Sequence, residues 1–134
     1  MATRRGKETP CTGREARNRV ATATAYQELA KLRPGDSTGA ARNAAAGNAV
    51  LAGIAAADAI CCLRLGGRSA STDHSDAVAL LARVDTALSR HLATLVGNKG
   101  LAHLGDTFIG PGALSRSIRA MDHLVAAANA MVHR

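Results

Sequence analysis

The chain has 134 residues, a formal net charge of +7 and 47% hydrophobic residues, but only one tyrosine, one phenylalanine and no tryptophan. A chain of this length is suited to a single domain that buries a hydrophobic core. A sandwich or barrel normally needs more aromatic and β-branched residues, whereas abundant alanine favours helices. The composition therefore predicts an all-α bundle, and the helical period of every long apolar segment predicts that it has no sheet.

Positive charge is concentrated at the start of the chain. Residues 1–33 carry eight basic and three acidic side chains, a net charge of +5. We divide the chain into a basic N-terminal arm, residues 1–12, and one bundle domain, residues 13–134. The basic region, with Arg14 and Arg17 in the first helix, is suited to a phosphate-rich partner such as RNA or a nucleotide. The alternative is a solvated arm that only keeps the protein soluble.

The three cysteines, Cys11, Cys61 and Cys62, fit neither a disulfide framework nor a zinc site by their spacing. We expect Cys61 and Cys62 to act as small hydrophobic residues, and we expect no metal and no cofactor. The stretch MATRRGKETP lacks the apolar segment of a secretory signal, and the alanine-rich region contains Asp58 and Arg64. These features predict a cytoplasmic protein without a membrane partner.

The predicted elements begin with a helix over residues 13–32, which Thr12 and Glu15 open as a capping box. Pro34 ends it, because the residue before a proline disfavours the α region. A loop over residues 33–38 leads to a long helix over residues 38–65. Its small residues lie mostly on one side, as in a helix at the middle of a bundle, and Gly66 and Gly67 follow its end.

A third helix is predicted over residues 75–84, with Asp73 or Thr72 as its N-cap. Asp85 caps a fourth helix, which continues to Leu104 after a kink near its glycines. Residues 105–112 form a turn-rich connection. Helical spacing of apolar residues then predicts the last helix over residues 113–132.

Lys99 and His103 are the candidate catalytic residues, in the stretch NKGLAHLG. Four residues apart on a helix, they project from the same face. Metal-free RNA cleavage needs an acid–base group and a positive charge near the phosphate, roles that histidine and lysine fill. The alternative is that His103 only packs and hydrogen-bonds within the helix bundle.

Asp58 lies in the apolar stretch GIAAADAICC, where an unpaired carboxylate would be costly to bury. If it is buried, it needs a partner, for which the candidates are His103, Lys99, Arg64 and His74. The alternative is that Asp58 lies on the solvent-exposed face of its helix.

Arg68 and His74 belong to a candidate binding loop over residues 66–74. Arg68 could hold a phosphate, and His74 lies near the free amides and positive dipole of a helix start. The alternative is a solvated turn with a local cap.

The order of these features resembles the HEPN family of small helical proteins, closest to its short actinobacterial members. The resemblance covers residues 38–132. It rests on DAICCLRLGGRS at the end of the long helix, a loop ending in DH, a helix with ALLARV, the segment LVGNKGLAHLGDTF and a terminal amphipathic helix. The family's motif is an arginine, then four to six intervening residues, then a histidine. His103 matches this histidine, Asn98 is among the residues at the arginine position, and Leu104 stands where a tyrosine can follow.

This resemblance implies a four- to five-helix up-and-down bundle of a kind that often forms homodimers. Family members include metal-independent ribonucleases, many of them toxins paired with nucleotidyltransferase-type antitoxins, and non-catalytic binding proteins. Three hypotheses follow: a dimeric bundle that binds RNA or a nucleotide, an active ribonuclease toxin that uses His103 and Lys99, and a protein-interaction adaptor.

Overall fold

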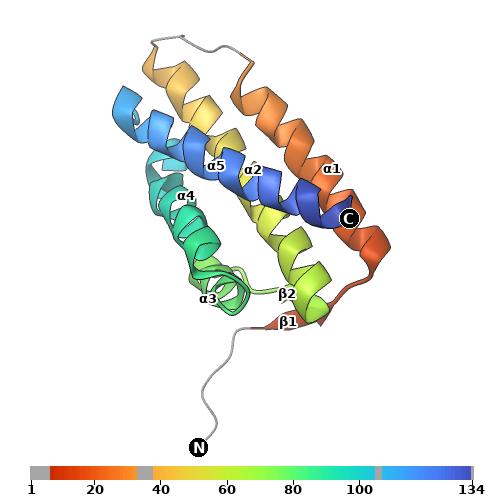
Figure 1. Cartoon of the computed structure of the whole chain (residues 1–134). Coiled ribbons are helices and arrows are strands. Elements are labelled where there is room, and N and C mark those ends of the chain that lie inside the picture. Colours follow the sequence, from red (N-terminus) through yellow and green to blue (C-terminus); the bar gives the residue numbers. More distant parts are fainter. Residues whose placement is uncertain (1–6, 33–37, 105–106, 134) are drawn as a thin grey trace, which may run out of the picture.

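The computed structural model describes residues 7–32, 38–104 and 107–133, with the backbone alone over residues 98–104. Five helices form over these residues, in the order α1 (Gly13–Ala30), α2 (Gly39–Leu65), α3 (His74–Ala82), α4 (Thr86–Leu104) and α5 (Pro111–Val132). Two short strands join them, β1 (Glu8–Pro10) and β2 (Gly67–Ser69). The predicted all-α helical bundle is confirmed (Figure 1).

α2 is the central helix of the bundle. It contacts every other described helix as well as β2, and α5 crosses in front of it (Figure 1). Alanine and glycine dominate the buried positions of α2, so the neighbouring helices can approach its backbone closely. The larger core side chains come from the surrounding helices and include Leu81, Leu92, Leu95, Met121 and Leu124.

The helix ends follow the caps expected from the sequence. Thr12 and Glu15 form a complete capping box at the start of α1, and the Asp73 carboxylate accepts from the Ser75 amide at the start of α3. Gly66 ends α2 with a φ of 75°, a left-handed conformation that glycine adopts without strain. α5 begins at Pro111, two residues earlier than predicted, because proline is well suited to the first turn of a helix.

The expectation of no sheet is wrong in one detail. β1 and β2 pair antiparallel, with Glu8 opposite Ser69, Thr9 opposite Arg68 and Pro10 opposite Gly67. Each strand has only three residues, too few for an alternating pattern to show in the sequence. The pairing joins residues about sixty positions apart and lies at the end of the bundle where α2 stops (Figure 1).

The expectation that Cys62 acts only as a small hydrophobic residue is also wrong. Cys11 and Cys62 form a disulfide, with their Cα atoms 5.6 Å apart. The strand pairing brings Cys11 to the last turn of α2, where its amide donates to the Gly66 carbonyl at 3.1 Å. Sequence spacing could not show this approach. Cys61 is a free, buried cysteine, in agreement with its predicted packing role.

The connection before α5 is anchored on the first turns of α2, at the other end of the bundle. The buried Asn43 side chain accepts from the Ile109 amide at 2.8 Å and donates to the Thr107 carbonyl at 2.9 Å. The Arg42 Nε donates to the Ile109 carbonyl at 2.7 Å. Because Thr107 follows α4 so closely, these bonds place the end of α4 beside the start of α2.

Candidate functional site

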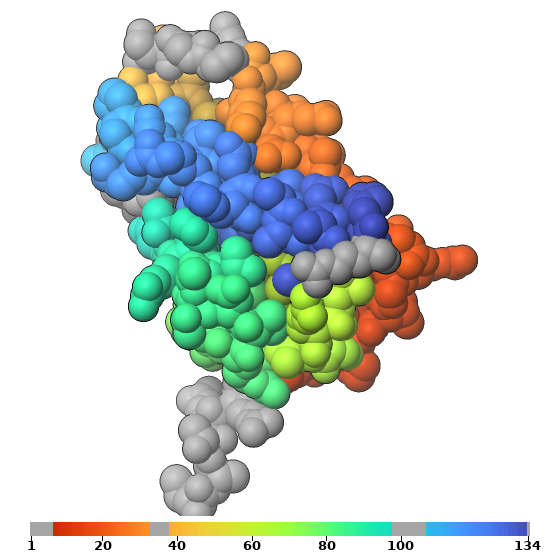
Figure 2. All heavy atoms as spheres, viewed as in Figure 1, coloured from red at the N-terminus to blue at the C-terminus, as the bar shows by residue number. Residues whose placement is uncertain are grey.

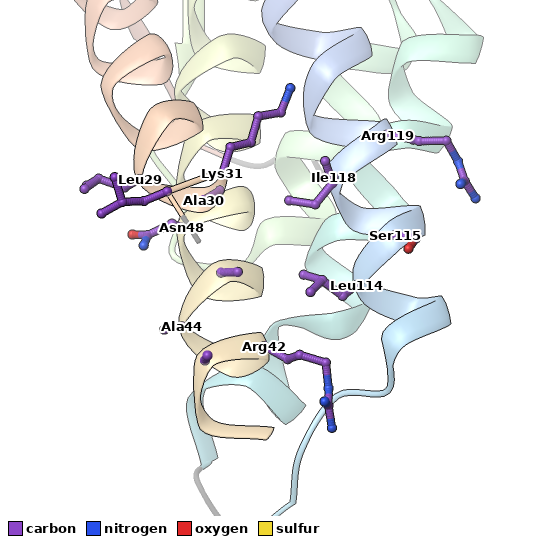
Figure 3. Close-up of a pocket in the computed structure, with 13 residues that line it drawn as sticks. Leu29, Ala30, Lys31, Arg42, Ala44, Asn48, Leu114, Ser115, Ile118 and Arg119 are labelled. Atoms are coloured by element: carbon purple, nitrogen blue, oxygen red, sulfur yellow. The ribbon is translucent and has the colours of Figure 1, made fainter. Parts of the chain in front are cut away.

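A groove with a volume of about 590 Å³ opens between the end of α1, the start of α2 and the start of α5. Figure 3 shows Leu114 and Ile118 of α5 pointing into it, opposite Ala44 and Arg42 of α2. In Figure 2 the hollow lies beside the end of α1 (orange) and the start of α5 (light blue). None of the predicted site residues whose side chains the structure describes lines this groove, namely Arg14, Arg17, Asp58, Arg68 and His74.

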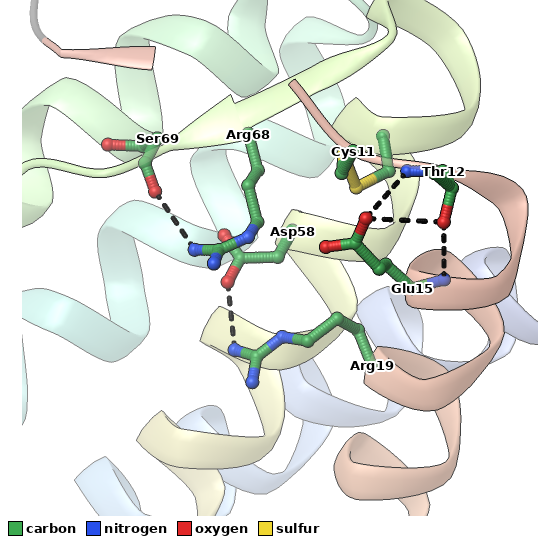
Figure 4. The surroundings of a disulfide bond; sticks show 8 residues. Cys11, Thr12, Glu15, Arg19, Asp58, Arg68 and Ser69 are labelled. Atoms are coloured by element: carbon green, nitrogen blue, oxygen red, sulfur yellow. Dashed lines mark hydrogen bonds and ion pairs between the residues drawn. A yellow bond between two sulfur atoms is a disulfide. The ribbon is translucent and has the colours of Figure 1, made fainter. Parts of the chain in front are cut away.

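A second region, at the sheet end of the bundle, contains Asp58 and its ion-pair partner. The Asp58 side chain is only 9% exposed, and its Oδ2 lies 2.8 Å from the Arg19 Nη2 (Figure 4). The prediction that a buried Asp58 needs a partner is confirmed. The ion-pair partner in the structure is Arg19, which was not among the four candidates and lies opposite Asp58 where α1 packs on α2. Of the four candidates, His74 lies close enough for its charge to favour the ionised carboxylate.

Arg68 and His74 lie near the same carboxylate. Figure 4 shows the Arg68 side chain directed toward Asp58, while its Nη1 is 3.5 Å from the Ser69 carbonyl. Burial raises the pKa of Asp58, and the charges of Arg19, Arg68 and His74 oppose that rise. The structure thus brings together three predicted binding residues, Asp58, Arg68 and His74. With Arg19 they form a set that we call the sheet-end cluster.

Cys61 is next to this cluster but is poorly suited to nucleophilic chemistry. Burial, and secondly the negative charge of Asp58, raise the pKa of the Cys61 thiol to about 12. The thiolate is the reactive form of cysteine, and at neutral pH a thiol with this pKa is almost entirely protonated. The sheet-end cluster therefore offers charge and hydrogen bonds to a ligand, but no activated nucleophile.

Arg14 and Arg17 lie on the outer face of α1 at the same end of the bundle. Both are exposed, and within the described residues neither makes an ion pair. Glu15, the acidic residue between them, turns back to the Thr12 amide and hydroxyl in the capping box. The disulfide and the β1–β2 pairing fix the start of α1, so these two arginines project from a well-anchored helix end.

Asn98, Lys99 and His103 lie in the last turns of α4, and their side chains are outside the described part of the structure. Their backbone is helical, as predicted. The end of α4 lies beside Asn43, and Asn43 is about 22 Å from Asp58 along α2 at about 1.5 Å per residue. The backbone of Lys99 and His103 lies in the part of α4 that leads toward the start of α2. Their predicted contact with Asp58 concerns side chains that lie outside the described part of the structure.

Comparison with known proteins gives no family. A scan against protein-family models finds no match, and searches of the curated proteins and of the solved structures find no significant similarity. The resemblance to HEPN proteins stays a prediction.

Two further properties limit the kinds of site that the described residues offer. Among them there is no group of three or more His, Cys, Asp and Glu side chains arranged to hold a metal ion. α2 is the one described helix long and apolar enough to cross a membrane, and 78% of its most apolar window is buried inside the bundle. The other helices cover this apolar surface, as they do for the core helix of a globular domain.

Proposed function

We propose that this protein is an RNA-binding helical bundle, which contacts phosphate groups through the sheet end of the molecule. The observation that carries the proposal is the pair of exposed arginines, Arg14 and Arg17, on the anchored start of α1. Arginine donates two parallel hydrogen bonds to a phosphate, and a helix N-terminus adds its own positive dipole.

Arg68 extends this basic surface beyond α1. Arg68 is half-buried and lies on β2 opposite Thr9. Thr9 in turn precedes the N-cap of α1 by three residues, so Arg68 lies close to the start of that helix. The Asp58 carboxylate is already paired with Arg19, which lowers its repulsion of a phosphate bound outside the cluster. A backbone with regularly spaced phosphates could therefore bridge Arg14, Arg17 and Arg68.

The direct test is fluorescence anisotropy with a labelled single-stranded RNA of about 20 nucleotides, measured across a series of salt concentrations. Phosphate contacts release counterions, so each lost contact should lower the slope of log affinity against log salt by about 0.7. We expect R14Q/R17Q and R68Q to bind more weakly and with smaller salt slopes. The matched control is R90Q/R116Q, which removes two exposed arginines of α4 and α5.

Equal loss of binding in the control would mean that only total charge matters and would contradict a defined binding surface. Competition with mononucleotides separates RNA from a nucleotide ligand. If a mononucleotide displaces the RNA at equal phosphate concentration, the ligand is a nucleotide and the RNA-binding proposal is wrong.

The predicted cytoplasmic location needs its own test. Structural disulfides persist mainly in oxidising compartments, so the Cys11–Cys62 bond argues against a reducing cytoplasm. RNA binding does not depend on this bond alone, because the β1–β2 pairing also holds the start of α1. Alkylation of free thiols in intact cells, followed by mass spectrometry of the Cys11 and Cys62 peptides, determines whether the bond forms there.

A further inference from the structure

The groove between α1, α2 and α5 has the composition of a binding site for an amphipathic anion. Its lining contains leucine, isoleucine and alanine, with Asn48 and Ser115 as the only uncharged polar side chains. Of the lining residues that the structure describes, three are basic, namely Lys31, Arg42 and Arg119, and none is acidic. A volume of about 590 Å³ lies within the range of roughly 300–1,000 Å³ found for small-molecule sites.

Apolar surface in the groove is left uncovered by the bundle. Leu29 is 50% exposed and Leu32 is 71% exposed, although both are large hydrophobic residues. Both line the groove, together with Leu114 and Ile118, whose side chains enter it from α5 (Figure 3). An alkyl chain laid between these two sides would remove apolar area from water at about 25 cal/mol per Å².

The basic residues are arranged at the edges of the groove and not on its floor. Lys31 pairs with Asp122 at 2.8 Å, and Arg42 donates to the Ile109 carbonyl. Figure 3 shows the Arg119 guanidinium directed away from the groove, and Arg119 makes no ion pair within the described part of the chain. As an exposed side chain, Arg119 can turn across the mouth of the groove while its aliphatic stem stays in place.

We propose that this groove binds a free monoacyl carboxylate of medium chain length, with the alkyl chain between α1 and α5 and the carboxylate at Arg119. Charge complementarity favours the anion, since the described residues of the lining include three basic side chains and no acidic one. The site is at the opposite end of the bundle from Arg14, Arg17 and the sheet-end cluster. It is therefore independent of the RNA-binding proposal.

The experiment is isothermal titration calorimetry of the full chain with dodecanoate at pH 8, below the micellar concentration of this ligand. We expect one dodecanoate per chain. Dodecanol and dodecyltrimethylammonium, which have the same chain with a neutral and a cationic head, should bind more weakly. Comparable affinity for all three compounds would overturn the assignment of an anionic ligand.

Two variants test the placement of the ligand. A45L adds a larger side chain inside the groove and should weaken dodecanoate binding about tenfold or more, whereas A93L, at an exposed position of α4, should not. R119Q should weaken binding about two- to fivefold, and R90Q should leave it unchanged. Circular dichroism checks that each variant folds, and A41L replaces A45L if the latter does not.

Other occupants of the groove give different results. If the wild type is dimeric by light scattering, A45L is monomeric and neither binds dodecanoate, the groove is an interface between two copies and the proposal is wrong. If the protein binds vesicles of anionic phospholipid but no free dodecanoate, the groove docks on a membrane surface and the proposal is again wrong. RNA binding by A45L should equal that of the wild type in every case.

Discussion

Arg19 shows how a single residue on the inner side of a helix determines the sheet-end cluster. It lies between Ala16 and Ala23, both buried, at helical spacing. An arginine on this face needs an acidic partner, and Asp58 is the one buried carboxylate among the described residues. This spacing was available in the sequence. What the sequence did not give was the register between α1 and α2, which depends on how their small residues pack.

We expect R19M to be more destabilising than D58N. R19M leaves a buried carboxylate without its partner, which typically costs about 3–5 kcal/mol; we expect about 2–3 kcal/mol, because Arg19 is 34% exposed and water can partly replace it. D58N keeps an oxygen that can accept from Arg19 and should cost less. Urea denaturation of both variants measures the difference. A larger loss in D58N would show that the charge of Asp58 itself stabilises the fold.

A pair of histidines predicts acid sensitivity at the surface between α4 and α5. The rings of His91 and His123 stack with their centroids 4.3 Å apart. Burial, and secondly the charge of His123, lower the pKa of His91, whereas Asp85 opposes the shift. A histidine with a lowered pKa in the folded state binds its proton more readily when unfolded. Its contribution to stability is therefore complete above the ordinary pKa of about 6.5 and is lost as the pH falls below it.

We expect the thermal unfolding temperature to fall between pH 8 and pH 5, and this fall to be smaller in H91Q than in the wild type. H133Q, which changes an exposed histidine at the end of α5, is the matched control. An unchanged fall in H91Q would assign the acid sensitivity to other groups.

His103 allows a direct test of the predicted nuclease activity. If Lys99 and His103 act together on one face of α4, purified protein should cleave RNA in the presence of EDTA. Loss of a general acid–base group typically lowers a rate about 10²–10⁴-fold, so H103A should show no detectable cleavage. Gel analysis of a labelled RNA measures this. Equal cleavage by wild type and H103A would point to a contaminating nuclease and contradict the role of His103.

At the scale of elements, the disulfide and the small sheet hold the start of α1 on the end of α2. The bond links residues 51 positions apart, and closing a loop of this length in the unfolded chain corresponds to a stabilisation of about 4 kcal/mol. Neither contact was predicted, because both depend on residues that approach only after α1 and α2 have packed. The helices themselves were predicted well, since their caps and spacing are local properties of the sequence.

We expect reduction of the disulfide, or the C11S variant, to lower the urea midpoint by an amount equivalent to about 2–4 kcal/mol. C61A is the control. It removes the free buried thiol of Cys61 but keeps the Cys11–Cys62 disulfide, so its urea midpoint should still fall on reduction as that of the wild type does. If reduction leaves the midpoint of the wild type unchanged, the bond makes no contribution to stability.

Two glycines on neighbouring helices should respond in opposite directions to the same substitution. A Cβ at Gly53 of α2 would collide with the Leu95 side chain of α4, whereas a Cβ at Gly97 would meet nothing within 4 Å. We expect G53A to be destabilising by about 1–3 kcal/mol through overpacking. G97A should be stabilising by about 0.5–1 kcal/mol, because alanine favours a helix interior. Denaturant midpoints of the two variants test this, and a stabilising G53A would mean that α2 and α4 pack more loosely than described.

At the scale of the whole molecule, the two proposed binding sites lie at opposite ends of the bundle. The basic start of α1 and the sheet-end cluster lie where α2 stops, while the groove lies where α2 and α5 begin. The sequence predicted Arg14, Arg17, Arg68 and His74 from local charge and loop position, and three of the predicted binding residues do meet. It gave no sign of the groove, because Leu29, Ala45 and Ile118 become neighbours only through the packing of three helices. The predicted homodimer stays a prediction.

The alanine-rich centre of α2 has a consequence for how this sequence can change during evolution. Seven of its alanines are buried against neighbouring helices, at Ala46, Ala49, Ala52, Ala55, Ala56, Ala57 and Ala59. A saturation library over α2 should therefore keep only small side chains at these positions. Leucine-rich helices around it can exchange one large side chain for another of similar volume. Sequence drift should thus be slow along the axis of the bundle and faster in the helices that surround it.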